Sequence, residues 1–498
     1  MKFDVIIIGT GLGSLLCGYI LGKEGFSVCL LEKQPQPGGN LQTFIRHGNK
    51  FDTGVHYIGA IGPGQTLARY WNYFGLMKNL PLQQLDPNGF DRVAFGETEF
   101  PLAQGFDNFS EQLINYFPGR KNTLDEYLGL MKQVIAEFPL YNHEFPGVHN
   151  EHHHASQSAR AVIEKTGDQA ISKSGIPLSA VLSGNNYLYG GSSATPLHVA
   201  SLINHSFITG AYRITGGSDI IWRSLVDSIQ SQGGKVMTRH EVTSIERIDQ
   251  KFLIKAGNRD PYMASLVISG IHPAKTMTML PVELVRTSYR SRLLSLKNTT
   301  SSFILFLSLK PGIIPYLNYN SYYHTSINCW DESNISKPGW PSMYLLSTGS
   351  SMPSPVFAET VTILTYMQFE EVAQWAGAQV GKRGQDYVDF KLQKAEKLLE
   401  LVFRKFPELK GAIDHMEIST PLTYQDYTGI PEGSLYGIER DYRNPLMTSV
   451  LPNTKIPNFY FTGQNTNLHG VLGVTIGAVA TCGNILGPEY LMKKMQNG

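Results

Sequence analysis

Glycines gather in a short segment near the N-terminus, directly after an apolar run. Residues 5–8 are all apolar, and the segment GTGLGS follows at residues 9–14. Gly9 permits a tight turn, and Gly11 lets the backbone approach a bound group closely. Glu32 lies about 20 residues further on, after a second apolar run, where a carboxylate can accept hydrogen bonds from ribose hydroxyls. This spacing predicts that the chain binds a dinucleotide.

The elements around this segment are those that place a pyrophosphate at a helix N-terminus. A strand over residues 5–8, an apolar helix from about Leu15 to Lys23 and a strand over residues 28–31 begin a βαβ unit. The first N–H groups of the helix are free, and the helix dipole is positive there. Ser14 replaces the last glycine of the GxGxxG pattern and is small enough for close helix–strand packing. The predicted cofactor contacts here also include Leu12 and Gly13.

A second glycine pair follows Glu32 closely. Residues 33–44 read KQPQPGGNLQTF, and FDTGVHYIG follows at residues 51–59. In NAD dehydrogenases the plain α/β alternation normally continues here, whereas in flavoproteins the chain folds back over the FAD pyrophosphate. We therefore predict that the dinucleotide is FAD. The predicted contacts in this region are Lys33, Gly38, Gly39, Asn40, Gly54 and Val55.

The segment FYFTGQNTNLHGVLGVTIGAVATCGNIL, residues 459–486, has the form needed for the other end of FAD. Residues 459–461 predict a buried strand, residues 462–465 a turn, and residues 471–486 a helix. The N–H groups of that helix can face the flavin pyrimidine edge, which becomes anionic when flavin is reduced. The predicted contacts in this segment are Gly463, Gln464, Asn465, Gly470, Val471, Leu472 and Gly473.

These motifs resemble those of the FAD-dependent phytoene desaturase and carotenoid isomerase superfamily, and most of all those of the retinol saturases. The resemblance extends through YRITGGSDII (212–221) and GGKVMTRHEVTSIE (233–246), and covers nearly the whole chain. It implies that Val242 contacts the adenine end through its backbone. Two positions depart from the pattern: Asn40 stands where arginine is frequent, and Asn465 where an aspartate usually contacts ribitol or phosphate.

The resemblance also implies the fold. We expect an α/β protein in which a Rossmann-like FAD-binding domain of the glutathione-reductase type is interleaved with an α+β substrate domain. The FAD-binding domain would comprise residues 1–75, 210–285 and 420–498. The substrate domain would comprise residues 76–209 and 286–419.

Two segments of the middle region bear on the substrate. The aromatic stretch YLNYNSYYH, residues 316–324, either lines an elongated apolar tunnel or covers a sheet. Residues 386–406 predict an amphipathic helix under the substrate sheet, with Val388, Leu392, Leu399, Val402 and Phe406 along its core side.

The reaction implied by the resemblance is hydride delivery from reduced, non-covalently bound FAD to one double bond of a polyene lipid, retinoid or carotenoid-like. A proton must then be added at the neighbouring carbon, and the resemblance places His56 and Tyr57 near the flavin as donors; His56 can equally be a packing residue. The electron donor stays open. Three alternatives remain: a carotenoid desaturase or cis–trans isomerase, an amine-oxidase-like flavoenzyme, and a non-enzymatic module of the GDP-dissociation-inhibitor type that binds prenylated proteins.

Composition argues against other partners. The 42 Lys and Arg residues balance 41 Asp and Glu residues, which gives no indication of nucleic-acid binding. Histidines at 149, 152, 153 and 154 lack metal-ligand spacing and predict a polar loop, so no metal site is expected. The four cysteines fit reduced thiols in a cytoplasmic protein. No apolar stretch is long enough to span a membrane, so we expect peripheral lipid contact, through SGIPLSAVLSG at residues 174–184.

Overall fold

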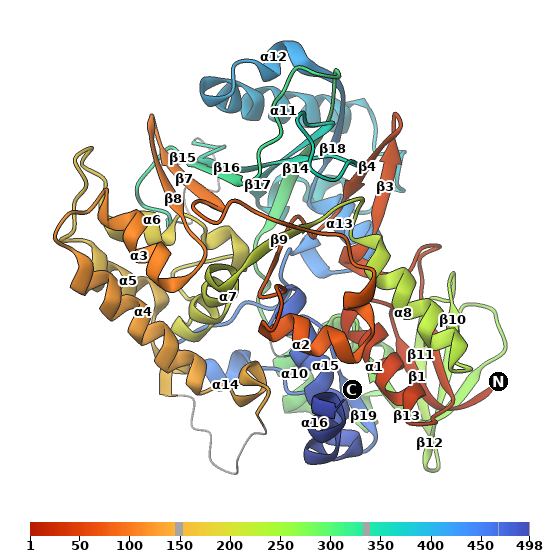
Figure 1. The fold of residues 1–498 in the computed structure, drawn as a ribbon. Coiled ribbons are helices and arrows are strands. Elements are labelled where there is room, and N and C mark those ends of the chain that lie inside the picture. The colour runs from red at the N-terminus through yellow and green to blue at the C-terminus, as the bar shows by residue number, and fades with distance from the viewer. Residues whose placement is uncertain (145–152, 332–338, 467, 498) are drawn as a thin grey trace.

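Strands from distant parts of the sequence form two large sheets in the computed structural model, which describes residues 1–144, 153–331, 339–466 and 468–497 (Figure 1). In the first sheet, parallel strands form the centre and an antiparallel pair forms one edge. Its strands are β10 (Lys235–Met237), β2 (Val28–Leu31), β1 (Lys2–Ile8), β13 (Tyr262–Ser269), β12 (Lys251–Ala256) and β11 (Val242–Ile248), with β19 (Phe459–Phe461) also paired to β13.

Strand β1 is buried on both faces, which explains its unbroken apolar run. Val5 and Ile7 pack in the core beneath helix α1 (Leu12–Lys23), whereas Ile6 and Ile8 pack in a separate core on the opposite face. Burial on both faces is typical of a parallel strand covered by helices on each side. The predicted strand–turn–helix at the N-terminus is confirmed.

Helices cover both faces of this sheet. On one face α1 packs against a helix from the middle of the chain and one from its C-terminal part. Those two are α8 (Asp219–Ser231) and α15 (Gly470–Leu486), and α2 (Thr66–Tyr73) and α16 (Pro488–Asn497) pack outside α15. The opposite face carries α9 (Pro273–Met279) and α10 (Thr287–Leu294).

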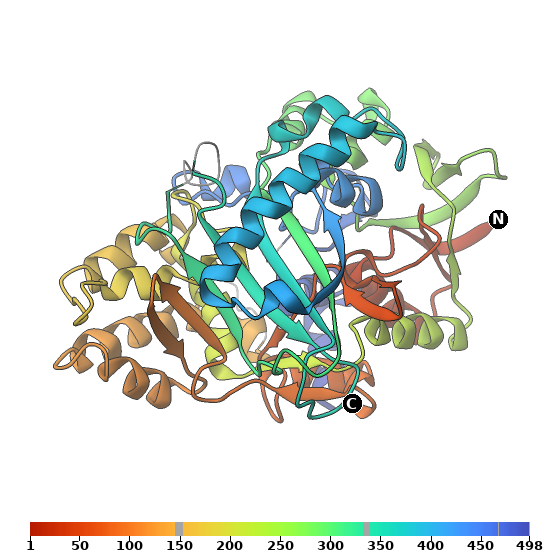
Figure 2. The same cartoon turned by 90° about the horizontal axis from the view of Figure 1, so that it is seen from above.

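The second sheet is antiparallel except where β7 pairs with β15. Its strands, in order, are β18 (Ile413–Ser419), β14 (Ser301–Leu309), β17 (Thr360–Met367), β16 (Met343–Gly349), β15 (Asn320–His324), β7 (Asp91–Phe95) and β8 (Thr98–Leu102). One face of the sheet carries α11 (Gln385–Lys405), which crosses its strands in Figure 2 and is followed by α12 (Leu409–Ala412).

Helix α11 forms where the sequence predicts it, but part of its predicted core side is wrong. Val388 is 39% exposed and Leu392 is 43% exposed. Val402 and Phe406 are buried as predicted, and the other buried positions are Tyr387, Lys394, Ala395, Leu398 and Leu401. The helix crosses only one sheet face and leaves its N-terminal half partly uncovered, so Tyr387 and the stem of Lys394 provide the contact there.

Smaller elements connect the two sheets. Strands β3 (Thr43–Arg46) and β4 (Asn49–Asp52) form a hairpin, and β5 (Ile58–Gly59), β9 (Ala211–Ile214) and β6 (Leu82–Gln84) form a small sheet. The remaining helices are α3 (Phe106–Ile114), α4 (Lys121–Ala136), α5 (Ala159–Gly167), α6 (Leu178–Ser183), α7 (Leu197–Thr209), α13 (Pro421–Thr428) and α14 (Pro445–Thr448). Because β5, β6 and β9 pair across the boundary drawn between residues 75 and 76, the division into two domains stays a prediction.

The segment predicted to touch lipid is not a surface patch. From Leu178 to Gly184 every residue is buried, and α6 packs its whole circumference against the core. A short helix that is apolar all round is a core helix rather than an interfacial one. That assignment is therefore wrong for residues 178–184, which form most of the segment; only Ser174 and Gly175 are exposed. Among the described residues, none of the helices is both long and apolar enough to cross a bilayer.

The histidine-rich segment falls partly outside the described residues, which exclude His149 and His152. His154 follows them, and its Nδ1 lies 2.6 Å from Oε1 of Glu137 in helix α4's C-terminal cap. Within the described ranges no cluster of side chains has the composition of a metal site. The cysteines carry free thiols, and Cys17, Cys29 and Cys482 are buried.

Candidate active site

A cavity of about 320 Å³ lies between the two sheets and receives both glycine-rich segments. Every residue predicted to bind the cofactor or to donate a proton lines it. These residues are Gly9, Gly11, Leu12, Gly13, Ser14, Glu32, Lys33, Gly38, Gly39, Asn40, Gly54, Val55, His56, Tyr57, Val242, Gly463, Gln464, Asn465, Gly470, Val471, Leu472 and Gly473.

The first glycine segment has the backbone that its sequence predicts. Gly9 has φ +88°, which L side chains rarely adopt, and the chain turns there from β1 toward α1. A Cβ at Gly11 would meet no atom within 4 Å, so the backbone there faces open cavity. The first turn of α1 lines the same cavity, with its unpaired N–H groups and positive dipole end.

Thr10 connects the acidic residue to the second glycine pair, a role that sequence reasoning missed. Oε2 of Glu32 accepts hydrogen bonds from the N–H of Thr10 at 3.0 Å and from its hydroxyl at 2.6 Å. Oε1 of Glu32 accepts from the N–H of Gln34 at 2.8 Å. The N–H of Gly38 donates to the carbonyl of Thr10 at 3.2 Å. These bonds fix the carboxylate at the cavity wall and leave lone pairs for a ligand hydroxyl.

The two glycine-rich segments meet although they lie at opposite ends of the chain. A Cβ on Gly13 would stand 2.8 Å from the backbone nitrogen of Gly463, and this distance is too short for any side chain at position 13. Gly39 approaches Gly11 in the same way, with a Cβ position 3.2 Å from its Cα. Glycine is therefore required here for backbone-to-backbone packing as well as for ligand approach.

Ser14 is accommodated by a glycine on the neighbouring strand end. A Cβ at Gly270 would lie 1.9 Å from Oγ of Ser14, so Gly270 leaves the space that the serine side chain fills. The missing third glycine of the fingerprint is thus compensated by a glycine elsewhere in the fold.

The C-terminal half of the site is held by a half-buried arginine that the sequence motifs did not reveal. Nη2 of Arg440 donates to the carbonyls of Asn465 at 2.8 Å and Thr466 at 3.1 Å. Oδ1 of Asn465 accepts from the N–H of Ile438 at 2.9 Å. The side-chain oxygen of Asn465 therefore orders the turn before α15. An asparagine can provide this oxygen as well as an aspartate can, which explains why it stands at this position.

Several buried polar atoms along the cavity have no hydrogen-bond partner among the described residues. Such atoms are rare because burial without a partner costs free energy. They are Oγ of Ser14, Oδ1 of Asn40, Nε2 of His56 and Nε2 of His469. Ser14 lies in the first turn of α1 and His469 is the N-cap residue of α15, and such helix N-termini fit a polar, negatively charged ligand such as a dinucleotide.

The two predicted proton donors have different environments. Burial, with a smaller contribution from Arg213, lowers the pKa of His56 to about 4, so its imidazole is neutral near pH 7. The hydroxyl of Tyr57 donates to Oδ2 of Asp91 at 2.9 Å and lies 2.7 Å from the hydroxyl of Tyr322. The geometry connects Tyr57, but not His56, to a buried acid.

The opposite wall of the cavity is apolar and aromatic. It comes from the second sheet, from α7 and from the loops around α13. Tyr322 of the aromatic stretch at 316–324 lines this wall, whereas its neighbour Tyr323 packs on the other sheet face under α11. Along this strand, Tyr322 therefore borders the cavity while Tyr323 covers the opposite face of the sheet, as the alternation of side chains in a strand requires. Other wall residues are Tyr187, Leu202, Phe207, Leu345, Leu364 and Tyr436.

A family model described as flavin-containing amine oxidoreductase matches residues 15–486. The chain belongs to this family. It is an FAD-dependent oxidoreductase, and the residues around the cavity fit FAD in their glycines, helix N-termini and unpartnered polar atoms. The predicted cofactor and enzyme class are confirmed.

Individual relatives extend the comparison. All-trans-retinol 13,14-reductase of Homo sapiens is 28% identical over 97% of this chain and 86% of its own length. Prolycopene isomerase 1, chloroplastic, of an Oncidium hybrid cultivar is 21% identical over 99% of this chain and 85% of its own. The crystal structure of an oxidoreductase from Methanosarcina mazei superposes with a TM-score of 0.65 at 17% identity, over 97% of this chain and 100% of that one. The last likeness confirms the predicted fold class.

Proposed function

We propose that the protein saturates one carbon–carbon double bond of a conjugated polyene lipid. The observation that carries this proposal is one cavity with two kinds of wall: glycines and helix N-termini at one end, and aromatic and aliphatic side chains at the other. When bound, reduced FAD supplies a hydride to a conjugated double bond. The apolar wall, rich in tyrosine and leucine, holds and orients a long hydrocarbon and excludes water.

The distribution of charge favours a neutral substrate over an amine. Among the described residues that line the cavity, the carboxylates are Glu32 and Glu241. Glu32 is bonded to Thr10, and Glu241 lies 3.9 Å from Lys275, so both belong to the end with the first glycine segment. A protonated amine would lose hydration at the apolar wall without meeting a carboxylate, which is costly. A polyene loses no such hydration.

Relatives at 28% and 21% identity carry the names of a retinol reductase and a prolycopene isomerase, which supports a polyene substrate but two reaction types. The sequence FDTGVHYIG, residues 51–59, favours the reductase type. The test is anaerobic incubation of the dithionite-reduced protein with retinol and with carotenoids, followed by mass spectrometry. We expect the polyene to gain two hydrogens. Unchanged mass with altered double-bond geometry would mean isomerisation, and loss of two hydrogens from the polyene when the oxidised protein is used would mean desaturation. Production of peroxide from amines would mean that the protein is an amine oxidase.

We also propose that the protein is cytoplasmic and reaches its lipid by peripheral contact with a bilayer. Leu446 is 88% exposed, Met447 56% and Leu451 68%, and all three belong to the loop around α14. Arg292 donates to the carbonyl of Met447 at 2.8 Å, and Arg443 precedes the helix. Exposed apolar side chains flanked by arginines suit the surface of an anionic bilayer.

A further inference from the structure

A carboxyl group is buried behind the aromatic wall, at the first residue of β7. Asp91 has no exposed surface, and it faces the cavity through two tyrosines that line it. Its Oδ2 accepts from the hydroxyl of Tyr57, and that hydroxyl lies 2.7 Å from the hydroxyl of Tyr322. Carboxyl and hydroxyl groups therefore form one continuous hydrogen-bonded chain that ends at the cavity.

The other carboxyl oxygen is held by an amide. Nδ2 of Asn320 donates to Oδ1 of Asp91 at 2.9 Å, and Nη2 of Arg213 donates to Oδ1 of Asn320 at 2.8 Å. The arginine is thus separated from the carboxylate by the amide and does not form an ion pair with it. Without an ion pair, burial disfavours the charged carboxylate and favours the protonated acid.

The environment of Asp91 lets it keep a proton until the pH approaches neutrality. Burial raises the pKa of Asp91 to about 7, although hydrogen bonds from Asn320, Tyr57 and Asn185 and the charge of Arg213 lower it. The titratable and charged groups facing this chain are Tyr57 before β5, Tyr322 on β15 and Arg213 on β9. His56 directly precedes Tyr57 and lines the cavity, and the charge of Arg213 lowers its pKa as well.

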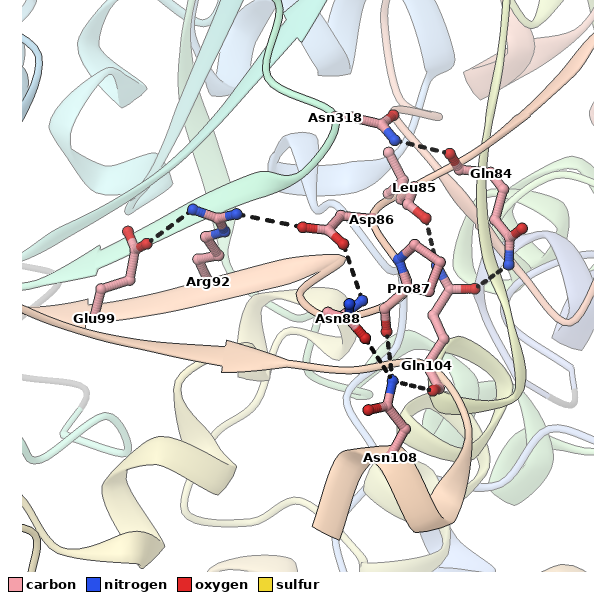
Figure 3. Close-up of polar contacts among 10 residues, drawn as sticks. All are labelled: Gln84, Leu85, Asp86, Pro87, Asn88, Arg92, Glu99, Gln104, Asn108 and Asn318. Carbon is pink, nitrogen blue, oxygen red and sulfur yellow. Dashed lines mark hydrogen bonds and ion pairs between the residues drawn. The ribbon is translucent and has the colours of Figure 1, made fainter. Parts of the chain in front are cut away.

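The turn before Asp91 is fixed by a polar network on its outer side (Figure 3). Asp86 accepts from Arg92 at 3.3 Å and from the N–H of Asn88 at 2.9 Å. Asn108 reaches from α3 to the carbonyl of Pro87 at 3.1 Å, and Gln104 donates to the carbonyl of Leu85 at 2.8 Å. These bonds hold the chain that leads into β7 and so hold the carboxyl in position.

We propose that Asp91 is the proton reservoir of the reaction and acts through the hydroxyl pair of Tyr57 and Tyr322. This inference rests on the proposed saturation of a polyene. The hydride, with both electrons, comes from bound reduced flavin and adds to one carbon of the double bond. The O–H bond of Tyr322 breaks as its proton adds to the neighbouring carbon, and the proton of Tyr57 passes to the Tyr322 oxygen. The protonated Asp91 carboxyl, as donor to Tyr57, in turn passes its proton to the Tyr57 oxygen. The carboxylate left behind regains a proton from water before the next turnover.

Tyr57 and Tyr322 touch the cavity and are the catalytic pair, whereas Asp91 is a positioning and proton-storing residue behind them. The variants Tyr57→Phe, Tyr322→Phe and Asp91→Asn test these roles separately. The matched control is Tyr344→Phe, because Tyr344 is equally buried in the same sheet but packs on the face under α11. Retained flavin absorbance identifies variants that fold and bind FAD.

We expect single-turnover reoxidation of the reduced protein by the polyene to slow by about 10²-fold or more in Tyr57→Phe or Tyr322→Phe. The wild-type rate should fall as pH rises through the pKa of Asp91, and Asp91→Asn should lose this dependence. The control should match the wild type. Normal rates and an unchanged pH profile in the variants, with the polyene still reduced, would overturn the relay.

A second readout needs neither FAD nor substrate. Infrared difference spectra of the flavin-free protein should show a carboxylic-acid band that disappears as pH is raised through about 7 and that Asp91→Asn lacks. Absence of this band in the wild type would overturn the reservoir even if a polyene is reduced. Conversely, a titrating band in a protein that reduces no polyene would refute the proposed reaction while leaving the protonated carboxyl established.

Discussion

Gly11 is the position where a single side chain should remove the cofactor without disturbing the fold. Its Cβ position is open in the protein, so valine causes no clash with protein atoms, yet it occupies the space beside the first turn of α1. We expect Gly11→Val to fold and to lose bound FAD, measured by absorbance after purification. Gly129→Val is the control, since its Cβ position on α4 is also open but lies away from the cavity. Full flavin content in Gly11→Val would refute the pyrophosphate assignment.

Asp91 should also be visible in the pH dependence of stability. In the folded protein it keeps its proton up to about pH 7, whereas the unfolded chain loses it near 3.8. Between these values the folded state binds more protons, so this group makes the free energy of unfolding fall as pH rises.

Asp91→Asn removes that contribution. Between pH 4 and pH 7, the free energy of unfolding of the variant should rise relative to that of the wild type by on the order of 1–4 kcal/mol. Urea unfolding of both proteins at several pH values measures the difference, and groups common to both cancel. A constant difference across this range would mean that the pKa of Asp91 is not raised.

At the scale of elements, the contact between α1 and the turn before α15 should tolerate no added atom. In Gly13→Ala the new methyl would meet the backbone of Gly463, which cannot rotate away as a side chain could. We expect a loss of roughly 1–3 kcal/mol in the free energy of unfolding, together with weaker FAD binding.

Gly129→Ala is the comparison for that variant, because it adds the same methyl to a helix at an uncrowded position. It should be neutral or stabilising by up to about 1 kcal/mol. Chemical denaturation and flavin titration of the two variants provide the test. Equal behaviour of the two alanine variants would show that the two glycine-rich segments do not pack as closely as described.

For the whole molecule, buried histidines should set the acid limit of stability. Burial is the largest cause that lowers the pKa of His143, His272 and His324 to about 4 and that of His469 to about 3. Below about pH 6.5 the unfolded chain binds protons that the folded protein does not, so the free energy of unfolding falls as pH decreases.

Each such proton contributes about 1.4 kcal/mol per pH unit between the unfolded and folded pKa values. Stability measured by urea unfolding should therefore decline steeply from pH 6.5 to pH 4, against the opposite, smaller trend of Asp91. A flat profile over this range would show that these imidazoles are protonated in the folded protein.

Lipid contact is also a property of the whole surface. Replacing Leu446, Met447 and Leu451 by serine removes side chains that each contribute roughly 1.5–3 kcal/mol when fully buried. We expect the triple variant to co-sediment several-fold less with phosphatidylserine-containing vesicles. Val356→Ser is the control, because Val356 is 73% exposed in a different loop. Equal binding by the triple variant would exclude the α14 loop.

The sequence by itself determined the cofactor end of the site, because glycine motifs record local backbone requirements. Gly9 needs a positive φ, and Gly13 and Gly39 need room for another backbone, so these residues could be found without coordinates. The unbroken apolar run Val5–Ile8 likewise predicted a strand buried on both faces. Such signals can be recognised in the local sequence even where the partner lies far along the chain, as Gly463 does for Gly13.

Only the tertiary structure decided which side chains meet across the fold. Asp91, Tyr57 and Tyr322 belong to separate segments, and although Tyr57 and the stretch containing Tyr322 stood out in the sequence, nothing there indicated that Asp91 lies behind them. Residues 174–184 are apolar whether they lie on a surface or in the core, and packing alone made α6 a core helix. Val388 and Leu392 are exposed because the face of α11 that meets the core there carries Tyr387, Lys394 and Ala395 instead. Burial and long-range hydrogen bonds depend on what lies opposite, which no single segment specifies.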